Sequence, residues 1–176
     1  MYALKKTILL TLLLLLFKVN SYSQVLESWN VYSSYSTVNA IAVSEEGIVY
    51  ASTLGGIFTI NADGIDNVYT TIDGMHRLDP SQTVYEENTN TLIIAYPDGT
   101  IDLFDMGSET FQKVEDISRG DQFPSKSINK IILTESELFV ATDFGIVIFT
   151  LEGFFVNTTI LKLGSFDRAI SVNDIS

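Results

Sequence analysis

A repeat of 44 to 46 residues constrains the fold of this chain more than any other feature of its sequence. Three segments align on their glycines, at residues 48–55, 92–99 and 138–145, and each reads as three apolar residues, an alanine, three variable residues and a glycine. The alanines and closing glycines are Ala51 and Gly55, Ala95 and Gly99, and Ala141 and Gly145, with alanine spacings of 44 and 46 residues. A period of this length suits a propeller blade or an armadillo-type pair of helices.

The local composition separates these two architectures. The repeated segments are short, rich in β-branched and aromatic residues, and bounded by turn-forming residues such as Pro97-Asp98-Gly99. Runs of five or six such residues indicate strands, because a helix needs about ten residues or more. We therefore expect an all-β fold, a β-propeller, in which each repeat is one four-stranded blade.

The expected strands follow from the repeat alignment. They are residues 38–43, 48–53, 57–60 and 67–72 in the first blade, 83–86, 91–96, 101–104 and 110–114 in the second, and 128–133, 138–142, 146–149 and 154–160 in the third. The blades are expected to span about 36–75, 80–118 and 126–162. The phrase Val38-Asn39-Ala40-Ile41 returns in altered form at residues 128–131 and 172–175, so a fourth blade is expected to begin at residue 170.

The first 23 residues have the layout of a secretory signal peptide. Lys5 and Lys6 precede an apolar run over residues 7–17, and a polar stretch with small residues follows. That run is too short to cross a hydrocarbon core of about 30 Å as a helix. We predict cleavage between Ser23 and Gln24, which leaves residues 24–176 as the N-terminal part of the propeller and places the protein outside the inner membrane.

Composition excludes several kinds of site. The chain has no cysteine and one histidine, His76, which argues against zinc centres, disulfides and nucleophilic triads. Its formal net charge is −12, and a nucleic-acid surface needs clustered Lys and Arg instead. The closest approach to a calcium loop, Asn61-Ala62-Asp63-Gly64, lacks the first acidic ligand and the distal glutamate. We expect no enzyme activity, no metal, no cofactor and no nucleic-acid partner.

Three blades and one opening strand are fewer than the four to eight that close a propeller. We expect the sequence to be the N-terminal fragment of a longer protein, and assembly of several chains into a ring is the alternative. The segment Trp29-Asn30-Val31-Tyr32 lies before the first blade. It is either a strand that completes the last blade or a strand that packs on the first.

Single polar residues carry weaker expectations. His76 is expected to be a solvated residue of the link between the first two blades. Asp98 and Asp143 precede blade glycines and are expected to shape turns, whereas alternation along its strand can place Asp102 outward. The tyrosines at strand positions are expected to pack between blades rather than to line a carbohydrate surface; they are Tyr50, Tyr69, Tyr85 and Tyr96.

The blade phrases resemble a known family. Residues 50–60 are similar to the blade signature of regulator-type propellers, with an aromatic residue, a small residue, Thr and Gly in order. Residues 92–102 and 141–147, together with Trp29-Asn30-Val31-Tyr32-Ser33-Ser34-Tyr35, resemble the N-terminal propeller of the PorZ-type protein of the type IX secretion system. The resemblance covers nearly all of residues 26–176.

The resemblance implies a non-catalytic component at the cell surface or outer membrane that helps to secrete cargo or attach it there. It implies as partners a sortase-like peptidase, other proteins of the outer-membrane attachment complex, and anionic lipopolysaccharide. The alternative is the extracellular sensor propeller of a hybrid two-component regulator that binds oligosaccharide. A propeller hydrolase or lyase is a third class, for which the sequence shows no catalytic constellation.

Overall fold

The computed structural model describes residues 36–176. The expected signal peptide, the cleavage site at Ser23 and Gln24, and the segment from Trp29 to Tyr32 lie outside the described residues, so they remain predictions. The described residues form strands, turns and loops without a helix. None of them forms a helix long and apolar enough to cross a membrane.

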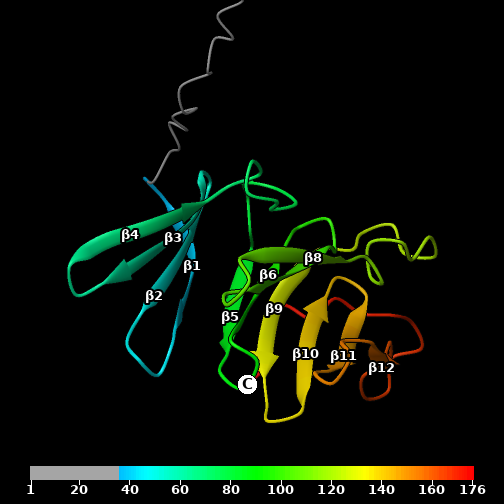
Figure 1. The fold of residues 1–176 in the computed structure, drawn as a ribbon. Coiled ribbons are helices and arrows are strands. Elements are labelled where there is room, and N and C mark those ends of the chain that lie inside the picture. The colour runs from blue at the N-terminus through cyan, green and yellow to red at the C-terminus, as the bar shows by residue number, and fades with distance from the viewer. Residues whose placement is uncertain (1–35) are drawn as a thin grey trace, which may run out of the picture. The chain divides into compact units, whose positions relative to one another are not determined.

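Twelve strands form three antiparallel four-stranded sheets, each a meander of consecutive strands. The first blade holds β1 (Val38–Val43), β2 (Val49–Thr53), β3 (Gly56–Asn61) and β4 (Gly64–Tyr69); the second holds β5 (Gln82–Glu86), β6 (Thr91–Ala95), β7 (Ile101–Asp105) and β8 (Thr110–Val114); the third holds β9 (Ile128–Leu133), β10 (Glu137–Thr142), β11 (Gly145–Thr150) and β12 (Val156–Ile160). The expected all-β class and the three four-stranded blades are confirmed, and the blades do not close into a ring (Figure 1).

Apolar faces of neighbouring blades pack against one another. Between the first and second blades lie buried residues such as Tyr50, Ile57 and Ile94, and between the second and third lie residues such as Ile93 and Val140. The first strands of successive blades, β1, β5 and β9, lie side by side. The middle strands are therefore covered on both faces, which explains why they read as nearly continuous apolar runs.

Most expected strands agree with the structure to within two residues at each end, and two depart further. The strand expected at 67–72 is β4, Gly64–Tyr69, because a tight turn pairs Asn61 with Gly64 directly after β3. Beyond Tyr69 the chain leaves the sheet, since the Asp73 carboxylate accepts hydrogen bonds from the backbone N–H and the hydroxyl of Thr70 at 2.8 and 3.0 Å.

The opening strand of a fourth blade, expected at residues 170–175, is not a strand in the structure. The segment is nevertheless held against the third blade, because the backbone N–H of Val172 donates to the carbonyl of Thr142 at 2.9 Å. The Asn129 side chain donates to the carbonyl of Val172 at 3.0 Å. Among the described residues, no strand pairs with this segment in a sheet.

Candidate functional site

The meander gives each blade two chemically different ends. Because consecutive strands run in opposite directions, the turns β1–β2, β3–β4 and their equivalents lie at one end of each blade, which we call the turn end. The β2–β3, β6–β7 and β10–β11 turns lie at the other end with the segments that link successive blades, residues 70–81 and 115–127 and those after β12. We call this the linker end.

A polar cluster at the linker end ties the first interblade link to the second blade. We call it the His76 network, and it consists of His76, Arg77, Asp79, Asp98 and Asp102. The Nε2 atom of His76 lies 2.8 Å from an Asp98 carboxylate oxygen, and Arg77 makes two 2.7 Å hydrogen bonds to Asp79 and lies 3.5 Å from Asp98. His76 is thus a half-buried, paired residue and not the solvated loop residue expected from the sequence.

Asp98 carries two roles in this network. Its Oδ1 atom accepts a hydrogen bond from the backbone N–H of Thr100 at 3.0 Å, which shapes the β6–β7 turn. Its Oδ2 atom is the partner of His76. Burial opposes ionisation of Asp98, but the hydrogen bonds from His76 and Thr100 outweigh it and hold the pKa of Asp98 below its ordinary value.

Asp102 lies inside the protein beneath this network. It is 1% exposed, and its Oδ2 atom accepts hydrogen bonds from the backbone N–H of His76 and the hydroxyl of Tyr96, each at 2.7 Å. Desolvation by burial raises the pKa of Asp102, although these two hydrogen bonds act against the shift. The outward orientation that strand alternation allowed is therefore wrong. The buried carboxylate anchors the link to the second blade.

A second polar cluster holds the third blade to the chain that follows it. The Asp143 carboxylate accepts hydrogen bonds from the side chains of Ser125, Asn129 and Ser171. The hydrogen bonds from Ser125 and Asn129 hold the pKa of Asp143 below its ordinary value. Asp143 was expected to shape a turn, but its carboxylate instead bonds these side chains and joins the link before β9 to the segment after β12, while the Thr142 hydroxyl makes the side-chain hydrogen bonds within the β10–β11 turn.

The repeated alanines and glycines occupy structural positions. Ala51, Ala95 and Ala141 are buried in the second strands of their blades. Gly145 has a φ of 144° and pairs with Thr142, and its counterpart in the first blade is Gly56, with a φ of 126° and a pairing to Thr53. Gly55, which the sequence alignment places opposite Gly145, lies inside the turn, and Gly99 belongs to the longer β6–β7 turn.

A groove at the turn end separates the first two blades. It has a volume of about 410 Å³ and is lined by Ser44, Glu46, Ile48, Tyr50, Tyr85, Glu87, Asn90 and Met106. We call it the tyrosine groove. The rings of Tyr50 and Tyr85 stack with centroids 5.0 Å apart, and the Tyr85 hydroxyl donates to the Asn90 side chain. The sequence did not single out this groove, because its two walls come from blades that only the fold brings together.

Burial and charge act together on these tyrosines. Desolvation, with the neighbouring Tyr85 and the carboxylate of Glu87, raises the pKa of Tyr50 to about 12. Burial and the carboxylates of Glu87 and Glu46 also raise the pKa of Tyr85. Both are consequently neutral phenols at physiological pH. Tyr50, Tyr69, Tyr85 and Tyr96 all belong to or pack against the core between the first two blades, as expected.

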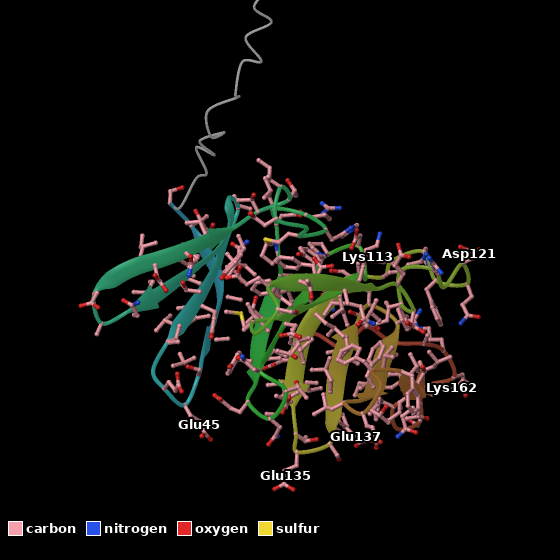
Figure 2. The ribbon with its side chains drawn as sticks, viewed as in Figure 1. Glu45, Lys113, Asp121, Glu135, Glu137 and Lys162 are labelled. Carbon is pink, nitrogen blue, oxygen red and sulfur yellow. The ribbon has the colours of Figure 1, made fainter. Side chains whose placement is uncertain are left out.

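The basic residues of the described chain lie toward one end of the blades, whereas acidic residues occur at both ends. The turn end holds Glu45, Glu46, Asp63, Glu86, Glu87, Asp105, Glu109, Glu135, Glu137 and Glu152, without a Lys, Arg or His. Every Lys and Arg between residues 36 and 176 lies in a link or in the part of a strand nearer the linker end: Arg77, Lys113, Arg119, Lys126, Lys130, Lys162 and Arg168. Figure 2 shows Glu45, Glu135 and Glu137 along the lower edge of the view, Lys113 and Asp121 higher up, and Lys162 between them.

The polar clusters contain no arrangement that we recognise as catalytic. His76 is bound through Nε2 to Asp98, and the pair holds the link to the β6–β7 turn. The described part of the chain contains no group of three or more His, Cys, Asp and Glu side chains placed to hold a metal ion. What the clusters do is join blades and links.

Four-stranded meander sheets that pack face to face at a repeat of 44 to 46 residues define the chain as part of a β-propeller. A family model for the N-terminal β-propeller domain of PorZ, of the type IX secretion system, matches residues 22–175. The chain belongs to this family.

Solved structures show the same fold. The chain is similar to PorZ, described as an essential bacterial surface component of the type IX secretion system of Porphyromonas gingivalis. The two share 18% sequence identity with a TM-score of 0.67, and the match covers 76% of this chain and 18% of the PorZ chain. It is also similar to the extracellular domain of a putative hybrid two-component system of B. thetaiotaomicron, with 19% identity and a TM-score of 0.61 over 74% of this chain and 19% of that one. No curated protein matches the chain.

Proposed function

We propose that this chain is part of a non-catalytic β-propeller component of the type IX secretion system, exposed at the cell surface or the outer membrane, that helps to secrete cargo proteins or attach them to the cell. The observation that carries this proposal is the match of residues 22–175 to the PorZ N-terminal propeller. Export rests on the signal peptide expected before Gln24. The proposed protein partners are a sortase-like peptidase and other proteins of the attachment complex.

The distribution of charge bears on the proposed contact with anionic lipopolysaccharide. The turn end holds acidic residues without a basic one, so it would repel phosphate and carboxylate groups of a glycolipid. The described Lys and Arg side chains lie toward the linker end, where Lys162 and Arg168 follow β12. The linker end also carries acidic residues, but it is where the described basic side chains lie, so any contact with an anionic glycolipid through this chain is proposed there.

A deletion of the gene tests this function. We expect type IX cargo to remain in the periplasm or to be released unattached, while the amount of cargo protein made stays the same. Fractionation followed by immunoblotting of one cargo protein measures the distribution, and the reintroduced gene is the control. Normal display of cargo on the deletion strain would contradict the proposal.

A sensor propeller is the second candidate, favoured by the similarity to the extracellular domain of a putative hybrid two-component system. In that role the chain would bind oligosaccharide and control transcription. The same deletion strain separates the two candidates. Loss of a transcriptional response to oligosaccharide, with cargo displayed normally, would support the sensor.

A further inference from the structure

The tyrosine groove has the size and the lining of a binding site. Its volume of about 410 Å³ falls within the range of about 300–1,000 Å³ common for ligand sites. Ile48, Tyr50, Tyr85 and Met106 supply apolar and aromatic walls, and Glu46 and Glu87 supply carboxylates. Tyr50 is only 2% exposed, whereas Tyr85 is half-buried, so the Tyr85 ring is the aromatic surface that a ligand would meet.

The charge around the groove selects the sign of its ligand. Glu46 and Glu87 are exposed residues of the β1–β2 and β5–β6 turns, and the described residues of the turn end include no Lys, Arg or His to neutralise them. Glu87 is held in place because one of its carboxylate oxygens accepts the backbone N–H of Glu45 at 2.5 Å. This bond also ties the two turns together. An anion would be repelled here, and a cation would be attracted.

We propose that the tyrosine groove binds an arginine side chain from a basic segment of a partner protein. A planar guanidinium stacks on an aromatic ring and donates paired hydrogen bonds to carboxylates, and the groove offers one such ring, on Tyr85, beside Glu46 and Glu87. A lysine ammonium carries the same charge but has neither the plane nor the fork of donors. The inference rests on this geometry alone and does not depend on the proposed role in secretion.

The experiment is a calorimetric titration of the full exported chain with a penta-arginine peptide, with penta-lysine and penta-glutamate as comparison peptides. We expect penta-arginine to bind about threefold or more tightly than penta-lysine, because of stacking on Tyr85. Penta-glutamate is expected not to bind. Absence of penta-arginine binding, or equal affinity for the two basic peptides, would overturn the proposal.

Two matched variants separate the groove from the general negative charge of the turn end. Glu87→Gln removes a carboxylate of the groove but keeps an oxygen that accepts the Glu45 N–H, whereas Glu135→Gln removes one charge from the exposed β9–β10 turn. We expect Glu87→Gln to weaken penta-arginine binding about fivefold and Glu135→Gln to change it less than about twofold. Equal losses in the two variants would show diffuse attraction to the turn end and would overturn the proposal.

Discussion

Gly56 and Gly145 show at the residue scale how one added residue changes the register of a repeat. The β1–β2 turn joins Val43 to Val49, one residue more than the equivalent turns, which join Glu86 to Thr91 and Leu133 to Leu138. Side chains alternate along a strand, so this extra residue shifts which side chains of β2 face the next blade. For that reason the counterpart of Gly145 is Gly56, although the sequence aligns Gly55 with it.

Substitution of Gly56 tests this register. Gly56 has a φ of 126°, and a Cβ added there would meet the carbonyl oxygen of Tyr69. Gly56→Ala is therefore expected to lower the free energy of unfolding by about 2 kcal/mol or more. Gly145→Ala is expected to do the same against the carbonyl of Ile160. The control is Gly47→Ala, where φ is 83° but nothing lies within 4 Å. Urea unfolding measures all three variants, and an equal loss for Gly47→Ala would contradict the steric argument.

At the scale of an element, the β5–β6 turn is closed by a single carboxylate. Glu86 is 4% exposed and accepts hydrogen bonds from the backbone N–H groups of Asn88 and Thr89 at 3.0 and 2.7 Å, and from both of their side chains. Burial opposes the ionisation of Glu86, but these hydrogen bonds outweigh it and hold its pKa below the ordinary value. The charged form of Glu86 therefore stabilises the folded turn.

This depressed pKa predicts a pH dependence with a definite sign. The stabilisation is present above the unfolded pKa of glutamate, about 4.3, and is lost as the pH falls through the lower folded pKa. Glu86→Gln is expected to lower the melting temperature at pH 7 by a few degrees, and the difference from the native chain is expected to shrink below about pH 4. Glu135→Gln, at an exposed turn residue, is the control. A difference that grows as the pH falls would contradict the role given to Glu86.

The same scale shows what local sequence can predict. The expected bounds of β1, β8 and β9 match the structure, because each is a β-rich run between turn-forming residues. β4 begins three residues earlier than expected, since the Asn61–Gly64 turn and the Thr70–Asp73 hydrogen bonds decide where it starts and ends. The pair of His76 with Asp98 depends on how a link meets a blade, and the pair of Tyr50 with Tyr85 on packing between two blades, neither of which a local pattern contains.

At the scale of the whole molecule, one face of the first blade is apolar and bare in the described chain. Ile41, Val43 and Ile65 are 60%, 56% and 62% exposed, and all three lie on the face of the sheet that points away from the second blade. Tyr85 and Ile131, which occupy the same repeat position as Ile41, pack against the preceding blade. A closed propeller would cover the face of the first blade in the same way with its last blade.

Cysteine labelling of the full-length protein tests this closure, with any cysteine outside these residues first replaced by serine; residues 1–176 contain none. Ile65→Cys places a thiol on the bare face, and Ile72→Cys places one in the first interblade link, where Ile72 is 68% exposed. If another blade covers the face, the thiol at position 65 should react with a maleimide at least about tenfold more slowly than that at position 72, since a buried thiol reacts only when the structure opens. Full denaturation should make the two rates equal, which controls for the local chemistry of each thiol. Equal rates in the folded protein would mean that the first blade stays bare and that the propeller is open at its first sheet.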